Sequence, residues 1–219
     1  MDEKLARRTF LKHLAAATVA LPATAAWSQY KSGKNPFALG IASGSPTHSS
    51  VVLWTRLYDE GVFSSNLPDV DIPVKWEMSA DKDFKSISYS GVSNAVAGLA
   101  HSVHVDVNNL PANSWFYYRF LVGDHVSAVG RTRTFADPAS NEQATLKLAF
   151  ASCQDFERGY FNSYPHLIAE KPDLVIFLGD YIYEFAPRRS SMRSHTGSWC
   201  ISLSDYRKRH AQYKQEAEL

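Results

Sequence analysis

Reactive side chains follow two apolar segments in the C-terminal third of the sequence. Cys153 closely follows Leu146–Ala151, and Asp180 closely follows Leu174–Leu178, with Tyr183 three residues further on. A thiolate, a carboxylate and a phenolate are all anionic donors, so they would repel one another at one point unless a cation lay between them. A hard, highly charged ion such as ferric iron could hold this set and would lower the proton affinity of its donors.

The pattern around these residues predicts the elements that position them. Leu174–Leu178 is a continuous apolar run, typical of a strand buried on both faces of a parallel sheet. A helical pattern over residues 160–170, with Pro165 near its start, separates the two apolar segments. Strand, helix and strand form one βαβ unit, whose crossover should be right-handed. Ligands bind beyond the carboxyl ends of such strands, so Cys153 and Asp180 would meet there if the strands are neighbours.

Each of these residues also has a purely structural interpretation. A lone cysteine at a strand end is commonly a small buried hydrophobe, and Gly-Asp after a strand is often only a turn. Tyr183 could be a core aromatic residue with its hydroxyl at the surface. A disulfide between Cys153 and Cys200 would consume the first donor. The coincidence of three donors at one edge favours a metal site.

Residues 36–137 show the pattern of an antiparallel β sandwich. Val103–Val107 alternates strictly, and Trp115–Val122 is a run of aromatic and aliphatic residues. Turn residues separate about seven such segments. Residues 110–119 resemble the Leu-Pro…Tyr corner of fibronectin type III sandwiches. The polar stretch 137–143 marks a boundary, after which residues 145–219 form a second domain that ends in a helix over Ser202–Leu219.

The first 26 residues have the features of an export signal. Arg7-Arg8 precedes Thr-Phe-Leu-Lys, an apolar stretch over Leu14–Leu21 follows, and small residues near Ala26 offer a cleavage site. The segment resembles the twin-arginine consensus. We therefore expect residues 1–26 to be a signal peptide read by the twin-arginine translocation machinery, with the mature protein periplasmic or secreted.

Composition excludes several classes of protein. The 219 residues hold 23 Lys+Arg and 22 Asp+Glu, a formal net charge of +1, which does not indicate a nucleic-acid partner. No apolar run reaches the roughly 18 residues of a membrane span, so no transmembrane segment is expected. Arg207-Lys208-Arg209 is interpreted as one solvated face of the last helix. Arg193 and His195 lie in a loop, where they could reach a phosphate or simply be solvated.

Two strings of residues decide between these alternatives. Phe150–Gln154 and Phe177–Glu184 closely resemble the PhoD-like family of alkaline phosphatases (alkaline phosphatase D), as do residues 193–197 and 203–210. The resemblance implies hydrolysis of phosphate mono- and diesters by a metal-bound hydroxide at a site of Fe³⁺ and Ca²⁺. It also implies that Cys153 and Tyr183 ligate the iron and that Asp180 bridges iron and calcium.

The family's catalytic domain continues for several hundred residues beyond this length. We therefore expect a fibronectin type III-like β sandwich followed by the first α/β unit of a metallophosphatase fold, truncated and with little or no turnover. The alternative is a non-catalytic secreted binding module whose sandwich domain is the working part. A cytosolic redox protein using Cys153 is a third interpretation, against which the export signal and the lack of a second nearby cysteine both count.

Overall fold

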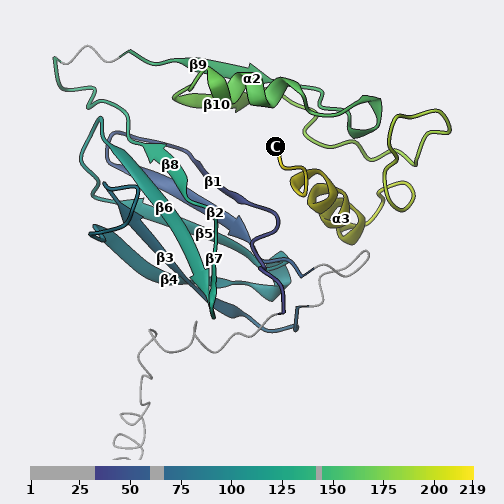
Figure 1. The fold of residues 1–219 in the computed structure, drawn as a ribbon, viewed down its shortest axis with the longest axis horizontal. Coiled ribbons are helices and arrows are strands. Elements are labelled where there is room, and N and C mark those ends of the chain that lie inside the picture. The colour runs from purple at the N-terminus through teal and green to yellow at the C-terminus, as the bar shows by residue number, and fades with distance from the viewer. Residues whose placement is uncertain (1–32, 60–66, 142–144) are drawn as a thin grey trace, which may run out of the picture.

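The chain folds as an antiparallel β sandwich followed by a smaller α/β part (Figure 1). The structure, a computed structural model, describes residues 33–59, 67–141 and 145–219. The expected signal peptide, residues 1–26, lies outside these residues and stays a prediction. Among the helices of the described ranges, none is long and apolar enough to cross a membrane.

Two antiparallel sheets make up the sandwich. One sheet has the order β1-β2-β5, and the other has the order β4-β3-β6-β7, with β8 also paired to β6. The strands are β1 (Ile41–Gly44), β2 (Ser50–Arg56), β3 (Ile72–Ser79), β4 (Tyr89–Ala95), β5 (Ser102–Asn108), β6 (Trp115–Val122), β7 (His125–Val126) and β8 (Gly130–Arg133).

Alternating side chains from both sheets form the main core. In β5 the residues Val103, Val105 and Val107 are buried while the residues between them are exposed or half-buried, and β6 alternates in the same way. Burying one such side chain contributes roughly 1.5–3 kcal/mol, so these two rows account for much of the stability of the sandwich. The valine alternation predicted β5, and the predicted antiparallel sandwich is confirmed.

Three strands of the sandwich have no clear sequence signal. The strand β4 is polar and half-exposed, and β1 and β7 are short. Gly91 of β4 lies opposite Trp76 of β3, and a Cβ there would sit 2.8 Å from the indole Nε1 of Trp76. The glycine therefore leaves room for the aromatic ring of the neighbouring strand.

The predicted βαβ unit is present. The strands β9 (Leu148–Ala151) and β10 (Leu174–Phe177) pair in parallel, and α2 (Ser163–Ala169) connects them. Pro165 lies in the first turn of α2, where backbone N–H groups have no partner within the helix, so its missing N–H is tolerated. A one-turn 3-10 helix, η3 (Phe156–Arg158), precedes α2, and α3 (Leu203–Lys214) follows β10. The helix α3 is five residues shorter at its end than predicted.

The prediction that Leu174–Leu178 is buried on both faces is wrong for the described chain. Phe150 is 73% exposed and Leu178 is 65% exposed. The register pairs Ile176 with Phe150, so both lie on the same face, while Phe177 on the other face contacts Tyr164 of α2. A parallel sheet needs a covering layer on each face, and within the described ranges only one face has it.

Candidate metal centre

The backbone brings the ends of β9 and β10 together. Leu178 N donates to Ala151 O at 2.8 Å, and Cys153 N donates to Gly179 O at 3.2 Å. The segments that follow β9 and β10 therefore stay paired beyond the strands. Cys153 (φ 55°) and Asp180 (φ 49°) both adopt the left-handed conformation. This conformation is uncommon outside glycine, asparagine and aspartate. Here it turns the backbone sharply at the two residues that carry the thiol and the carboxylate.

The three predicted donors meet at one carboxylate oxygen. Cys153 Sγ lies 3.6 Å from Asp180 Oδ2, and Tyr183 OH donates to the same oxygen at 3.1 Å. Cys153 and Asp180 are exposed, while Tyr183 is half-buried. A thiol, a carboxylate and a phenol from two strand ends therefore converge at the carboxyl edge of the parallel pair, where ligands bind in open α/β sheets.

The surroundings of Tyr183 keep its phenol protonated. Burial, followed by the hydrogen bonds and negative charge of Cys153 and Asp180, raises the pKa of Tyr183 above its ordinary value. Both neighbours are acidic groups, so ionising the phenol would add a further negative charge to the cluster. The proton of Tyr183 instead forms the hydrogen bond to Asp180.

The donor set fits a highly charged cation only if the phenol is included. Among the described residues, no group of three or more His, Cys, Asp and Glu side chains could hold a metal ion. Cys153 and Asp180 supply sulfur and oxygen, and Tyr183 supplies a third donor on the same oxygen of Asp180. Thiolate, carboxylate and phenolate together carry enough negative charge to balance a trivalent ion.

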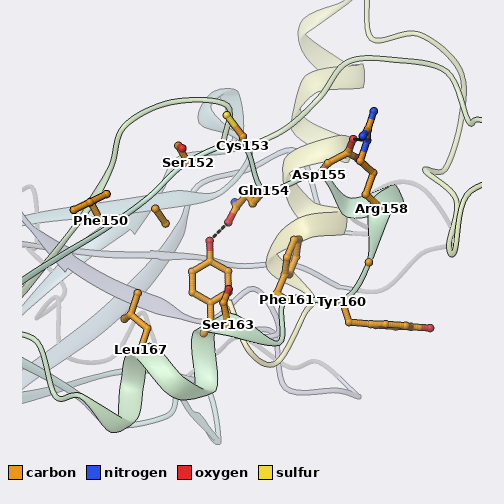
Figure 2. A pocket seen from close by; sticks show the side chains of 13 residues that line it. Phe150, Ser152, Cys153, Gln154, Asp155, Arg158, Tyr160, Phe161, Ser163 and Leu167 are labelled. Atoms are coloured by element: carbon orange, nitrogen blue, oxygen red, sulfur yellow. Dashed lines mark hydrogen bonds and ion pairs between the residues drawn. The ribbon is translucent and has the colours of Figure 1, made fainter.

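Gln154 fixes the segment that follows Cys153. Its Nε2 donates to Tyr181 O at 2.8 Å, and its Oε1 accepts a hydrogen bond from the hydroxyl of Tyr164 in α2 (Figure 2). Gln154 is buried, beside a groove of about 450 Å³ that Cys153 also lines. The side chain of Gln154 therefore ties the end of β9 to the loop that carries Tyr183. The Cys-Gln string in the sequence marked this position without indicating its structural role.

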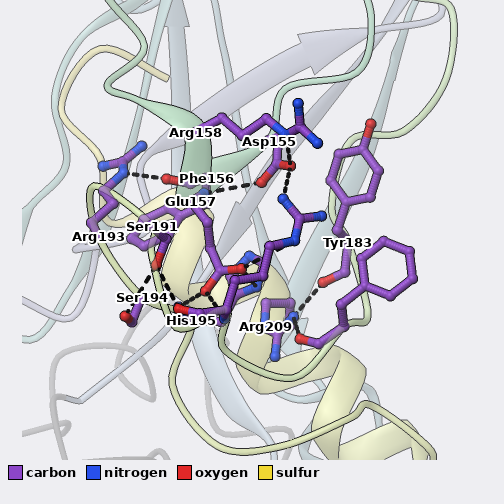
Figure 3. A network of polar contacts seen from close by, with 12 residues as sticks. Asp155, Phe156, Glu157, Arg158, Tyr183, Ser191, Arg193, Ser194, His195 and Arg209 are labelled. Carbon is purple, nitrogen blue, oxygen red and sulfur yellow. Dashed lines mark hydrogen bonds and ion pairs between the residues drawn. The ribbon is translucent and has the colours of Figure 1, made fainter.

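Two acidic residues next to Gln154 organise the loop after β10 (Figure 3). Glu157 is 1% exposed, and its Oε1 accepts hydrogen bonds from the backbone N–H groups of Arg188 and His195, each at 3.1 Å. Asp155 Oδ2 accepts from Arg188 Nη1 at 2.7 Å. The positive charges of Arg188 and Arg158 and these hydrogen bonds outweigh partial burial and lower the pKa of Asp155.

Arg209 of α3 also bonds to the loop after β10. Its guanidinium donates to the carbonyl oxygen of Tyr183 (Figure 3). It also donates to the carbonyl oxygens of Phe185 and Ser198. Arg209 is 2% exposed, so the prediction that residues 207–209 form one solvated face is wrong at this position. Lys208 is exposed as predicted. The reason is helical geometry, because adjacent residues point about 100° apart and cannot share one face.

Arg193 and His195 make contacts within the protein. Arg193 donates to Phe156 O at 2.6 Å, pairs with Glu216 at 2.5 Å and lies over the ring of Phe156. His195 is buried with its Nε2 3.0 Å from Tyr213 OH, and burial and the charge of Arg209 lower the pKa of His195. These contacts favour a structural role for both side chains. Cys153 and Cys200 are both free thiols, so the alternative disulfide is not formed.

Comparison with known proteins identifies the family of both parts of the chain. The family described as PhoD-like phosphatase, N-terminal domain, matches residues 22–136, and the family described as PhoD-like phosphatase matches residues 148–219. The chain belongs to the PhoD-like phosphatase family. The resemblance predicted from the two strand-end motifs is thereby confirmed.

Two similar proteins are longer than this PhoD-like chain. Alkaline phosphatase D of Bacillus subtilis (strain 168) is 46% identical over 189 residues, which are 84% of this chain and 32% of that protein. The solved structure of PhoD has a TM-score of 0.83 at 44% identity, over 87% of this chain and 37% of that chain. The chain therefore spans about a third of the length of these relatives. A human fibronectin type III domain reaches a TM-score of only 0.34 at 13% identity.

Proposed function

We propose that this chain supplies part of the metal centre of a phosphate-ester hydrolase. The observation that carries the proposal is the convergence of Cys153 Sγ and Tyr183 OH on Oδ2 of Asp180. Membership of the PhoD-like phosphatase family supports a phosphatase at the level of the family. The β9–α2–β10 unit would then be the beginning of a metallophosphatase domain, with phosphate mono- and diesters as the class of substrate.

We infer that Cys153 and Tyr183 would hold a ferric ion and that Asp180 would bridge it to a calcium ion. The iron, when bound, would acidify a water molecule to supply hydroxide near neutral pH, and the calcium would hold the phosphate oxygens. The protein's own contribution is orientation, because Asp180 presents one oxygen to both other donors. On binding the ion, Tyr183 would release its hydroxyl proton to the solvent. The exposure of Cys153 and Asp180 leaves the cluster accessible to a substrate from solution.

These residues alone form an incomplete centre for two ions. Calcium takes six to eight oxygen ligands, whereas Asp180 can offer at most two oxygens. We therefore expect the 219 residues by themselves to bind iron but to hydrolyse phosphate esters very slowly. We also propose that the protein is exported through the twin-arginine machinery to the periplasm or the medium. This part of the proposal rests on the sequence of residues 1–26, which lie outside the described ranges.

Iron binding by donor variants tests the proposal. The purified chain is mixed with Fe³⁺ as its citrate complex, and bound iron and visible absorption are measured after removal of free iron. We expect Cys153→Ala and Asp180→Asn to lower iron affinity at least tenfold. We expect Tyr183→Phe to remove the visible absorption of an iron–phenolate pair, because no phenolate would then reach the ion.

Matched substitutions on exposed residues serve as controls. Asp106→Asn on β5 removes a carboxylate far along the chain from the cluster, and Tyr206→Phe on α3 removes an exposed phenol. Both controls should bind iron as the unaltered chain does. Equal iron binding by the controls and the three donor variants would refute the proposed centre.

A further inference from the structure

The segment that carries two of the three donors has no regular structure of its own. Residues 178–202, between β10 and α3, contain neither a helix nor a strand. Backbone N–H and C=O groups in such a long segment must find partners elsewhere, or burying them would be costly. The position of Tyr183 therefore depends on side chains from other elements, which bond to the backbone of residues 178–202.

Two buried side chains of opposite charge supply these partners. Glu157 accepts hydrogen bonds from backbone N–H groups at residues 188 and 195, and Arg209 donates hydrogen bonds to backbone carbonyls. Both side chains are almost fully buried. An anion that binds N–H groups and a cation that binds C=O groups together fix the path of the segment, because each satisfies the kind of backbone group that the other cannot.

The bonds of Arg209 fall on the residues next to the donor phenol. Its Nη1 donates to Tyr183 O and, at 3.1 Å, to Phe185 O, while Nη2 donates to Ser198 O at 3.1 Å. Between these carbonyls, Glu184 O accepts from Cys200 N at 2.9 Å. One planar guanidinium thus clamps residues 183–185 against residues 198–200. Arginine suits this task because its five donors lie in a fixed fork, whereas lysine offers one point charge.

The helix that carries Arg209 is itself attached to the sandwich. Arg56 of β2 donates to Arg207 O at 3.2 Å, and Arg207 donates to Gly98 O at 2.7 Å. The guanidinium of Arg209 is therefore held by a fixed helix rather than by the loop. We propose that Arg209 is a positioning residue that holds the Tyr183 phenol against Asp180 for metal binding. This inference rests on the proposed function, because it assigns Tyr183 a ligand's role.

Variants at Arg209 separate positioning from a general structural effect. Arg209→Met removes the guanidinium, and Arg209→Lys keeps the charge but loses the fork. Lys208→Met is the matched control, because it removes a positive charge from the adjacent exposed position of α3. For each variant, Fe³⁺ is supplied as citrate, and we measure bound iron, visible iron–phenolate absorption per bound iron, and amide hydrogen exchange of Cys200 in the metal-free chain.

We expect both Arg209 variants to bind iron through Cys153 and Asp180 with at least tenfold lower affinity and less than half the absorption per iron. The amide of Cys200 should exchange at least tenfold faster, because its acceptor Glu184 O lies between the clamped carbonyls. Lys208→Met should change none of these values. If Arg209→Met does not fold, Arg209→Lys alone decides the outcome.

Failure of the two ideas would look different. Unchanged absorption per iron and unchanged Cys200 exchange in a folded Arg209 variant would overturn the positioning role while leaving the metal centre intact. A chain that binds no iron in its unaltered form would refute the proposed function, and with it the ligand role of Tyr183. The exchange data would then still show whether Arg209 clamps the segment.

Discussion

At the scale of single residues, the candidate site depends on two left-handed backbone conformations, of which the one at Cys153 is unfavourable. Cys153 and Asp180 both have positive φ, and Cys153 is a residue type that rarely adopts it. Such conformations cost of order 1–3 kcal/mol each and persist when the surrounding structure holds them. Here Gln154 and the paired backbone of Gly179 provide that support. The strain places the thiol beside the carboxylate.

The backbone strain at Cys153 predicts an unusual effect of glycine. We expect Cys153→Gly to be more stable than Cys153→Ala by about 1 kcal/mol, because only glycine adopts the left-handed conformation without steric cost. Both variants lack the thiol, so the comparison isolates the backbone. Free energies of unfolding from urea titrations measure the difference.

The same pair of residue types at an ordinary strand position provides the control for Cys153. At Ala149, within β9, glycine should be less stable than alanine by about 0.5–1 kcal/mol. The sign of the glycine effect should therefore reverse between residues 149 and 153. A less stable Cys153→Gly than Cys153→Ala would show that the conformation at this position carries no strain.

The sequence predicts the meeting of Cys153 and Asp180 better than the rest of the site. Parallel strands bring their carboxyl ends to one edge, so topology alone places these two residues together. The contact of Tyr183 depends on the irregular segment after β10, which no periodic pattern describes. The sequence indicated it through the coincidence of three donor types at one edge and through the family motif. Arg209 belongs to a run of three basic residues, and nothing in their composition distinguishes the buried one from the exposed Lys208.

At the scale of elements, α3 connects the two parts of the chain and carries Arg209. Its N-terminus has a capping box, in which the Ser202 hydroxyl accepts from Asp205 N at 3.2 Å and Asp205 Oδ2 accepts from Ser202 N at 2.9 Å. The residue that caps this helix is therefore Ser202. Hydrogen bonds from the hydroxyl and the backbone N–H of Ser202, and from the backbone N–H of Ile201, lower the pKa of Asp205. The ionised carboxylate then lies at the positive end of the helix, where a negative charge is stabilised.

Removing the cap should destabilise α3. We expect Ser202→Ala to lower the free energy of unfolding by about 1 kcal/mol, because the N–H of Asp205 loses its acceptor. Ser204→Ala, two residues further along and exposed, should change it by less than about 0.5 kcal/mol. Urea titrations of both variants measure the difference. Equal effects at residues 202 and 204 would contradict the capping role.

Prediction of the elements succeeded where burial is one-sided and regular. The strand β6 was predicted with its observed bounds, and β5 nearly so, because each buries every second residue against the other sheet. The strand β4 escaped prediction because its half-exposed residues show no apolar alternation. The division into residues 36–137 and 145–219 stays a prediction, since the connecting residues 142–144 lie outside the described ranges.

At the scale of the whole molecule, the sandwich contacts the α/β part on more than one side. Arg133 of β8 pairs with Asp173 at 2.6 Å, with both side chains largely buried. On another side, the His210 ring of α3 stacks on the ring of Tyr181, with 5.8 Å between the ring centroids. It also meets the ring of Trp54 of β2 edge-on, with 6.3 Å between the centroids. Tyr181 directly follows Asp180, so the His210 contact connects the sandwich to the neighbourhood of the candidate site.

The free energy of unfolding should decrease as the pH decreases, because of His210. Burial, together with the charges of Arg56 and Lys214, lowers the pKa of His210 from 6.5 to about 4. As the pH falls from ~7 to ~4, the unfolded chain binds this proton before the folded chain does, so the free energy of unfolding decreases. A shift of this size corresponds to a loss on the order of 3 kcal/mol across that window.

Replacing the titrating ring separates His210 from other acid-sensitive groups. His210→Phe keeps an aromatic ring between Tyr181 and Trp54 but binds no proton, so unfolding free energies from urea titrations at pH 7, 5.5 and 4 should fall less steeply. His195, whose pKa is also lowered, should leave a smaller slope in this variant. The pKa values of Asp155 and Asp173 lie below their ordinary range, so the stabilisation that these carboxylates contribute is lost mainly below ~pH 4. His104→Phe, at an exposed position of β5, should keep the full slope. An equal slope in His210→Phe and the unaltered chain would mean that the contact between the two parts does not exclude water from this ring.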